Sequence, residues 1–304
     1  MIKQLFLFPL ATAINLFSMT FLLILAGFCG NEELSAEIAV IQGAIVAVFM
    51  SLSGNARSLL LSDQSLKREN GVLLFRLIIV LPAALIALFL TENIIELPML
   101  LIIGLIIRKI FEWLIEVQLA SMEKSGDYAF AKKYIAVTVV SLSVLAAQIP
   151  FSVDDFFYYA LYIWAASPIL FLLPYLYKHA WKSEGMREVR KFIPHLGSST
   201  IIGIATYILR VLVVLLVGKT LAGQLFTAFA IGGLASAIYT YALGPTLLLK
   251  EKGGIKSKLI FFSAIFALIG LILVFFSEQG GLSLHSAVFS QMIGISIVGG
   301  GIML

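Results

Sequence analysis

The chain consists largely of a succession of long apolar runs, and this pattern restricts it to one class of fold. A helix needs about 20 apolar residues to cross the ~30 Å hydrocarbon core of a bilayer. Ten runs are about this long and contain few charged residues. We therefore predict an all-α polytopic membrane protein with about ten transmembrane helices. The predicted spans are 5–28, 38–60, 72–90, 97–118, 134–150, 156–177, 197–217, 224–248, 259–276 and 285–304.

Composition supports this class. Hydrophobic residues make up 61% of the 304 residues and charged residues 12%, whereas a soluble domain is about 45–50% apolar and about a quarter charged. The first run reaches Gly30, too far for the core of a cleaved signal peptide, so we predict an uncleaved first span. The single cysteine, Cys29, excludes an internal disulfide. His179, His195 and His285 are scattered, so we expect no metal site and no cofactor.

The basic residues predict the orientation in the membrane. With the N-terminus in the cytoplasm, 19 of the 21 lysines and arginines fall on the inner side, and the outer loops are acidic. Only Lys219 falls outside, and Arg210 lies within a span. Such an asymmetry is the positive-inside pattern. It explains the net charge of +4 without nucleic acid as a partner.

Two stretches of the chain match each other in spacing. Gly43 and Gly54 lie 190 residues before Gly233 and Gly244. Coincidence is the alternative explanation, because the chain has 24 glycines. A parallel repeat in a transporter implies two helix bundles with a site between them. We therefore predict a six-helix N-terminal lobe, residues 1–180, and a C-terminal lobe, residues 186–304, with about four helices. A second match aligns Thr12, Asn15, Ser18 and Leu22 with Thr200, Gly203, Thr206 and Arg210 at a separation of 188 residues.

The run 197–217 contains one charged residue, Arg210. Ser199, Gly203, Thr206 and Arg210 recur at spacings that place them on one helical face. A charge at membrane depth costs at least ~2.5–3.5 kcal/mol unless it faces protein or water. The stripe therefore predicts a cavity wall in which Arg210 is a cation for an anionic substrate. The alternative is an arginine that snorkels to the outer surface.

The span 97–118 carries a cluster of charged residues in its second half. Arg108, Glu112 and Glu116 recur every four residues on one face, next to Lys109. We predict that Arg108 and Lys109 help bind an anionic substrate, and that Glu112 or Glu116 binds a coupling proton or Na⁺. The alternative is an amphipathic helix end at the inner membrane boundary with local ion pairs.

Arg57 is a further candidate cation, at the inner end of the span 38–60. A planar guanidinium at the cavity mouth suits bidentate contact with phosphate. The alternative is an ordinary positive-inside anchor. On the first span, Asn15 and Ser18 complete the predicted polar face of the cavity, together with Ser199 and Thr206 of the span 197–217.

The chain resembles bacterial polysaccharide transporters, the O-antigen type lipid-linked oligosaccharide flippases of the multidrug/oligosaccharidyl-lipid/polysaccharide exporter superfamily. The resemblance rests on the layout of the whole chain and on three segments. These are Ser53-Gly54-Asn55-Ala56-Arg57-Ser58, Arg108-Lys109-Ile110-Phe111-Glu112-Trp113-Leu114, and Phe192-Ile193-Pro194 after a long basic loop.

The resemblance implies two six-helix lobes around a cationic cavity that opens alternately to each side of the bacterial inner membrane. The implied substrate is a polyprenyl diphosphate-linked oligosaccharide, held through its diphosphate by arginines such as Arg210 and Arg57. Other implied partners are membrane lipids and the proteins of polysaccharide or lipopolysaccharide assembly. The family usually has twelve or more spans, so ten spans suggest that the C-terminal lobe is truncated.

Two rival functions stay open. A multidrug/cation antiporter of the same superfamily would share the fold but usually needs a buried carboxylate in the upper half of a lobe, and the sequence offers none outside the span 97–118. A membrane-embedded glycan polymerase or acyltransferase would need a large polar loop or a His/Asp/Glu cluster at the membrane face. The sequence therefore favours a transporter over an enzyme.

Overall fold

The computed structural model describes residues 7–53, 56–62, 66–92, 96–151, 155–179, 200–238, 241–242 and 294. Within these ranges the chain is helical and has no strand, as predicted. Six of the described helical segments are long and apolar enough to cross a membrane, which indicates an integral membrane protein. The predicted total of ten spans and the internal repeat are not confirmed. The predicted spans 259–276 and 285–304 lie outside the described residues, except for Gly294.

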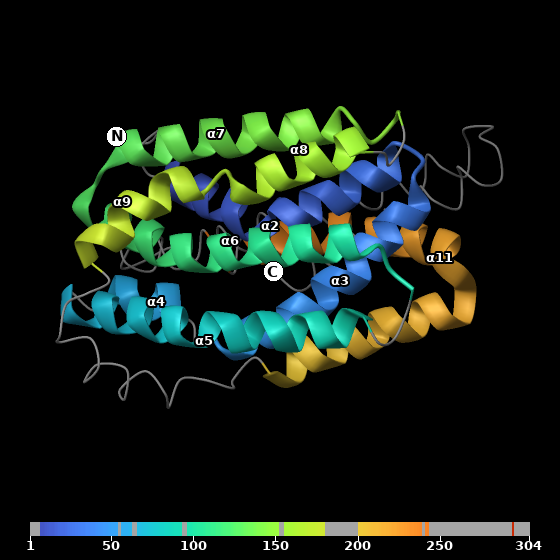
Figure 1. The fold of residues 1–304 in the computed structure, drawn as a ribbon, viewed down its shortest axis with the longest axis horizontal. Coiled ribbons are helices and arrows are strands. Elements are labelled where there is room, and N and C mark those ends of the chain that lie inside the picture. The colour runs from blue at the N-terminus through green and yellow to red at the C-terminus, as the bar shows by residue number, and fades with distance from the viewer. Residues whose placement is uncertain are drawn as a thin grey trace.

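The described helices pack side by side, most of them along the long axis of the molecule (Figure 1). α7, α8 and α9 form one side of the bundle in this view, and α4 and α5 form the opposite side. The helices are α2 Leu7–Phe28, α3 Glu32–Ser51, α4 Ala56–Ser62, α5 Leu66–Glu92, α6 Met99–Ser125, α7 Tyr128–Ala146, α8 Asp155–Ala166, α9 Ile169–His179 and α11 Thr200–Ile238.

α3 is the central helix of the described bundle. Of its membrane-length window 78% is buried, since it contacts α2, α5, α6 and α11. The contact with α11 is the most extensive in the described fold. Small residues permit it: a Cβ built on Gly203 would lie 2.8 Å from the Cα of Ala47, too close for any side chain. Close approach of helix backbones at small residues is typical of membrane interfaces.

Short polar turns connect successive helices. The side chain of Asn31 accepts a hydrogen bond of 3.2 Å from the backbone N–H of Leu34 and so caps α3. Asp127 caps α7 in the same way, through the N–H of Phe130 at 3.1 Å. Between α6 and α7, Gly126 adopts a left-handed conformation with φ 72°, which ends α6. Because these turns are short, the helices that they connect, α2 with α3 and α6 with α7, lie antiparallel and in contact.

Two predicted spans contain breaks. The predicted span 38–60 is divided, because α3 ends at Ser51 and α4 begins at Ala56. The predicted span 156–177 is divided into α8 and α9 at Ser167 and Pro168. α11 reverses direction at Gly218, whose φ of 80° is non-helical. This reversal lies between the predicted spans 197–217 and 224–248, so the sequence located that turn.

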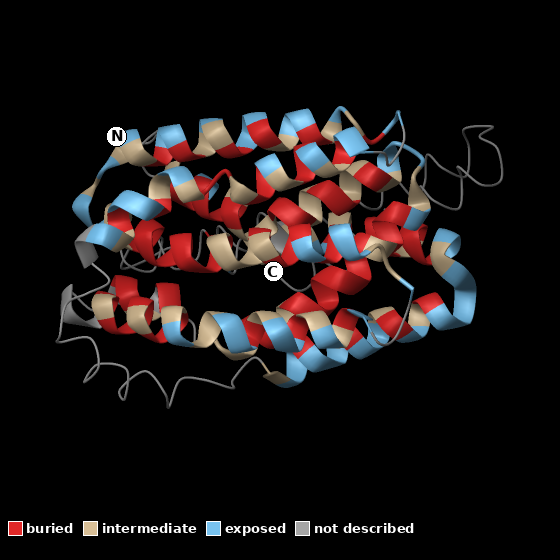
Figure 2. Cartoon of the chain, in the orientation of Figure 1, coloured by how far each residue is buried: buried red, intermediate tan, exposed pale blue. Residues whose placement is uncertain are grey.

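The outer faces of the bundle are apolar. Exposed residues follow the outward sides of α5, α7 and α11 (Figure 2), and many are large hydrophobic residues, such as Leu81, Val140, Ile201 and Leu216, at 63–81% exposure. An apolar surface of this extent is rare on soluble monomers and marks contact with lipid or protein. It agrees with the membrane class inferred from the apolar runs.

Polar contacts tie distant segments together at the two ends of the bundle. At one end, the Lys219 ammonium lies 2.8 Å from a carboxylate oxygen of Glu37 and 3.0 Å from the carbonyl oxygen of Glu96. At the other end, Arg57 donates to the carbonyl oxygens of Tyr241 and Ala242, both at 2.9 Å. The sequence predicted Glu37, Glu96 and Lys219 on the outer side and Arg57 on the inner side. Which end faces the cytoplasm stays a prediction.

Candidate functional site

α6 carries three glutamates, and each forms an ion pair with an arginine. Glu112 lies 2.9 Å from Arg108 on the same helix, and Glu116 lies 2.8 Å from Arg76 of α5. Glu123 lies 2.7 Å from Arg57 of α4. All six side chains are at most 11% exposed. The pairs therefore extend from the middle of α6 to its C-terminal end.

The charged cluster lies farther from the end of its helix than the sequence predicted. We expected the helix to end near residue 118, with Arg108 to Glu116 at the inner membrane boundary. Instead α6 has 27 residues and continues to Ser125, so Glu112 is at its midpoint. Arg108 also contacts Ser167, at the break in the middle of the α8–α9 segment. Because Arg108 and Glu112 are buried, they need partners within the protein.

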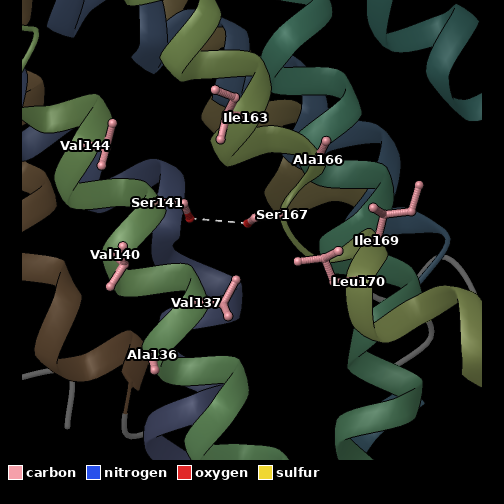
Figure 3. Close-up of a pocket in the computed structure, with 10 residues that line it drawn as sticks. All are labelled: Ala136, Val137, Val140, Ser141, Val144, Ile163, Ala166, Ser167, Ile169 and Leu170. Carbon is pink, nitrogen blue, oxygen red and sulfur yellow. Dashed lines mark hydrogen bonds between the residues drawn. The ribbon is translucent and has the colours of Figure 1, made fainter.

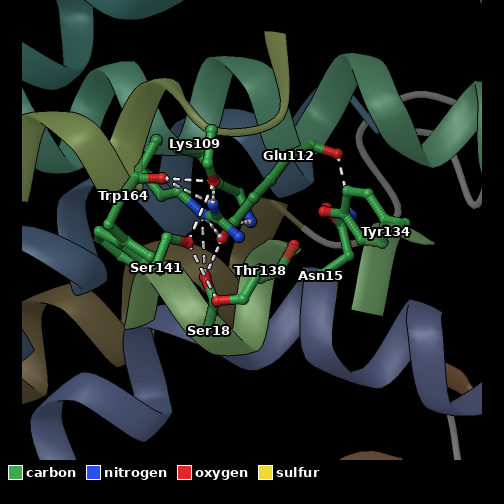
Figure 4. A network of polar contacts seen from close by, with 10 residues as sticks. Asn15, Ser18, Lys109, Glu112, Tyr134, Thr138, Ser141 and Trp164 are labelled. Atoms are coloured by element: carbon green, nitrogen blue, oxygen red, sulfur yellow. Dashed lines mark hydrogen bonds and ion pairs between the residues drawn. The ribbon is translucent and has the colours of Figure 1, made fainter. Parts of the chain in front are cut away.

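The side chain of Arg108 is fully buried. It takes part in the network of polar contacts to which Ser18, Glu112 and Trp164 of Figure 4 belong. Its Nε donates to Glu112 at 2.9 Å and to the hydroxyl of Ser18 at 3.2 Å. Its Nη1 donates to the carbonyl oxygen of Trp164 at 3.0 Å and to the hydroxyl of Ser167 at 3.3 Å. The guanidinium carbon also lies 4.6 Å from the centre of the Trp164 ring, within cation–π range.

Pro168 explains why a backbone carbonyl is free to bind Arg108. In a continuous helix the carbonyl of Trp164 would accept from the N–H of residue 168, and proline has none. The helix breaks there, and Trp164 instead accepts from Arg108 Nη1 and from the Ser167 hydroxyl at 2.9 Å. Non-helical backbone at membrane depth is tolerated only where protein or water satisfies it. Arg108 is therefore one of the donors, with Ser167, that satisfy the carbonyl freed by the α8–α9 break.

α2 and α7 complete the network around Glu112. The Ser18 hydroxyl donates to the Glu112 carboxylate, and the Asn15 amide donates to the Glu112 carbonyl oxygen at 3.0 Å. The hydroxyl of Tyr134 donates to Asn15 in turn. Asn15 and Ser18 are fully buried. The sequence predicted both as polar residues of one face, and the structure brings them to Glu112; their part in a substrate cavity stays a prediction.

Some polar atoms of this network have no hydrogen-bond partner. They are Arg108 Nη2, Glu112 Oε2 and Trp164 Nε1, all buried. The ammonium of Lys109, 12% exposed, lies 3.6 Å from Glu112 Oε2, an ion-pair distance but too long for a hydrogen bond. Arg108, Lys109 and Glu112 together have a formal charge of +1. The network therefore has a positive excess and spare hydrogen-bonding capacity at the middle of α6.

Sequence reasoning missed Arg76 as a site residue and counted it as an inner-side charge. α5 begins at Leu66, so Arg76 lies roughly 15 Å along it, and it is fully buried. It repeats the arrangement of Arg108: it pairs with Glu116, donates to the carbonyl oxygen of Trp113, and lies 4.8 Å from the Trp113 ring centre. The sequence did contain a signal for Arg76. An apolar run follows it, and the five residues before it, 71–75, are glycine or apolar.

Arg210 contacts α3 and is partly buried. Its Nη1 donates to the carbonyl oxygen of Ala39 at 2.6 Å and to the side-chain oxygen of Gln42 at 3.1 Å. Gln42 is held by Thr20 of α2, at 2.8 Å. The predicted polar stripe thus faces a helix across the α3–α11 contact, since Gly203 lies against α3 as well. A substrate-binding role for Arg210 stays a prediction.

The remaining predicted residues are at separate places. Thr206 donates to the carbonyl oxygen of Ile202 within its own helix, at 2.8 Å, and Ser199 lies outside the described residues. Arg57 lies on α4 rather than at the end of α3. The hydrogen bonds described above join Arg57, Arg108 and Arg210 to different partners. The structure thus brings together Arg108, Lys109, Glu112, Asn15 and Ser18, with Glu116 in a second pair on the same helix.

In the described part of the chain, no group of three or more His, Cys, Asp or Glu residues is arranged to hold a metal ion. Comparison with protein-family models, with curated proteins and with solved structures found no match.

Proposed function

We propose that the chain is a transporter that moves a polyprenyl diphosphate-linked oligosaccharide from the cytoplasmic to the outer leaflet of a bacterial inner membrane. The observation that supports this most is the buried Arg108–Glu112 pair at the midpoint of α6, beside a helix that is broken in mid-bundle. Ionisable residues at membrane depth commonly mark substrate or ion pathways. Broken helices are likewise common at the substrate sites of transporters.

The chemistry of the ion pairs suits an anionic head group. A guanidinium binds carboxylate and phosphate in the same bidentate geometry, so a diphosphate can replace a glutamate as the partner of an arginine. Arg57 is the cation expected at the inner mouth, and it is held by Glu123 at 2.7 Å. In the proposed cycle the diphosphate takes the place of such a carboxylate, and the two lobes then rock to open the outer side.

Repeated transport requires an energy source, which we assign to proton or Na⁺ exchange at Glu112, with Glu116 as the second carboxylate. Neutralising Glu112 would leave the charge of Arg108 unbalanced in a site that is fully buried. That cost favours a conformation in which Arg108 meets an anion or water. Ion binding at Glu112 and substrate binding at Arg108 would then be coupled, as alternating access requires.

The cation antiporter is the second candidate, because Glu112 is a buried carboxylate in the middle of the N-terminal segment, 1% exposed. The charge balance argues for an anionic substrate instead. Arg108 neutralises Glu112, and Lys109 adds a further positive charge 3.6 Å away. An organic cation would therefore meet a net positive environment.

A vesicle assay tests the proposal. Purified protein is reconstituted with a fluorescent polyprenyl diphosphate oligosaccharide, and a membrane-impermeant reagent reports how much of the sugar reaches the other leaflet. We expect transport that an imposed proton or Na⁺ gradient accelerates. Transport no faster than in protein-free vesicles would refute the function, and uptake of organic cations instead would favour the antiporter.

Variants with matched controls test which residues take part in ion coupling and in transport. Glu112→Gln keeps the shape of the side chain but removes the ionisable group, and we expect it to abolish the effect of the gradient. Glu37→Gln is the control, because it makes the same change in the Lys219 pair, where the ammonium is 31% exposed. Undiminished gradient dependence in Glu112→Gln would remove Glu112 from coupling. Undiminished transport in Arg210→Ala would remove Arg210 from the mechanism.

A further inference from the structure

A groove lies between α7 and the broken segment α8–α9, on the side of the bundle away from α3 (Figure 3). It encloses about 610 Å³, within the range of roughly 300–1,000 Å³ typical of small-molecule sites. Val140 and Val144 line it from α7, and Ile163 and Leu170 line it from α8 and α9. Among the described residues of its lining, Ser141 and Ser167 are the polar ones.

The two serines have their hydrogen bonds without a ligand. Ser141 donates to the carbonyl oxygen of Thr138 at 3.1 Å and lies 3.3 Å from the hydroxyl of Ser167. Ser167 donates to the carbonyl oxygen of Trp164 at 2.9 Å. None of the described residues that line the groove is charged. An occupant therefore has no hydrogen bond or ion pair to make, and hydrocarbon suits the groove best.

The groove opens to the outer surface near the middle of two segments, α7 and α8–α9, that are each long and apolar enough to cross a membrane. Val140, Ile163 and Leu170 are 63–66% exposed. Ser167 lies at the break in the middle of the α8–α9 segment, and Val140 lies beyond the midpoint of α7. The lining of α7 extends from Ala136 to Val144, which is ~12 Å of helix. Each leaflet contributes ~15 Å of hydrocarbon, so the groove lies where the chain ends of the two leaflets meet.

We propose that this groove is a binding site for the terminal half of one acyl chain of a bilayer phospholipid. The chain fills the space between α7 and the α8–α9 break with methylene and methyl groups. Ser167 of the groove floor accepts from Arg108 Nη1 at 3.3 Å, so the bound chain supports the broken helix that holds Arg108. This proposal stands whether or not the chain transports a lipid-linked oligosaccharide.

Photocrosslinking in reconstituted bilayers tests the site. Two phosphatidylcholines are used, one with a diazirine near the methyl end of an acyl chain and one with a diazirine near the carboxyl end. Crosslinked residues are mapped by mass spectrometry. We expect the methyl-end probe to label Val140, Ile163 and Leu170 more strongly than Leu81 and Leu85 of the α5 surface, and the carboxyl-end probe to show no such preference. Equal labelling of the groove and the α5 surface by both probes would overturn the proposal.

A filled-groove variant provides the matched comparison. Val140→Trp occupies the groove, whereas Val139→Trp adds the same side chain to an adjacent position of α7 that is 43% exposed and outside the lining. We expect loss of preferential groove labelling in Val140→Trp and its retention in Val139→Trp. Both positions face outward, and helicity and gel filtration check that both variants fold. Preferential labelling that survives in Val140→Trp would contradict the site.

Two further outcomes would also overturn the proposal. Cys29→Ala with Val140→Cys places the only cysteine in the groove, because Cys29 is the single native one. Rapid reaction with a water-soluble, membrane-impermeant maleimide would show that the groove holds water rather than an acyl chain. Loss of the groove labelling on addition of a small fraction of polyprenol would show that a polyprenyl chain is the preferred occupant.

Discussion

Removing Arg108 alone should destabilise the protein more than removing Arg108 and Glu112 together. In Arg108→Met the Glu112 carboxylate, 1% exposed, loses its ion-pair partner at 2.9 Å. Leaving one partner of a buried pair uncompensated costs about 3–5 kcal/mol. The Trp164 carbonyl also loses a donor at 3.0 Å, but Ser167 still donates to it at 2.9 Å. We therefore expect Arg108→Met to cost at least ~3 kcal/mol.

The double variant Arg108→Met with Glu112→Gln removes the unpaired charge. What remains is the loss of hydrogen bonds around Trp164 and Ser18, for which we expect about 1–3 kcal/mol. The double variant should thus cost about 2 kcal/mol less than Arg108→Met alone, so the costs of the two single changes should not add. Lys109, 3.6 Å from Glu112, moderates the single change because it can compensate part of the carboxylate charge.

Reversible unfolding in mixed micelles, with increasing mole fraction of sodium dodecyl sulfate, measures these free energies. The control is Lys219→Met, which breaks a pair whose ammonium is 31% exposed and should cost about 0–1 kcal/mol. A double variant whose cost equals the sum of the two single costs would refute the reasoning. It would mean that Arg108 and Glu112 do not depend on each other for their burial.

Three further predictions use the same unfolding assay. Gly203→Ala should destabilise the protein by about 1–3 kcal/mol, because its Cβ would lie 2.8 Å from the Cα of Ala47; Gly233→Ala, whose Cβ meets nothing within 4 Å, should be neutral or stabilising by up to ~1 kcal/mol. Equal effects would show that the helix contact is loose. Tyr134→Phe should cost ~1 kcal/mol, the worth of its hydrogen bond to Asn15, and no change would mean that Asn15 is satisfied without it. Arg76→Met should cost about 3–5 kcal/mol by leaving Glu116 unpaired; a cost below 1 kcal/mol would show that water reaches Glu116.

Much of the helix pattern could be predicted from the sequence, because it depends on local properties. The first predicted span, 5–28, corresponds to α2, Leu7–Phe28. The turn predicted between residues 217 and 224 is the reversal at Gly218. The predicted helix ends were less accurate where polar residues extend a helix beyond its apolar part. α6 continues to Ser125 because charged side chains find partners on neighbouring helices, and hydropathy alone does not report partners.

The candidate site was predictable only in part. The spacing of Arg108, Glu112 and Glu116 indicated a charged face of one helix, and the structure pairs both glutamates with arginines. The spacing in the sequence did not indicate that Arg76 would pair with Glu116 from another helix. It also did not indicate that Pro168 would free the Trp164 carbonyl for Arg108. Both depend on contacts between residues 40 or more positions apart, and periodicity carries no information about them.

The helical membrane class follows from the apolar runs alone, because runs of membrane length leave the backbone few other ways to satisfy its hydrogen bonds in lipid. The position of the charged residues along the chain likewise shows which helix carries them. The partner that neutralises each charge became known from the packing of the helices: Arg108 bonds to Glu112 and to a broken helix, and Arg210 bonds to a carbonyl of α3. The reason is that an ion can be buried in a membrane protein only where neighbouring helices supply a partner for it. The distances between helices are set only when the helices have packed.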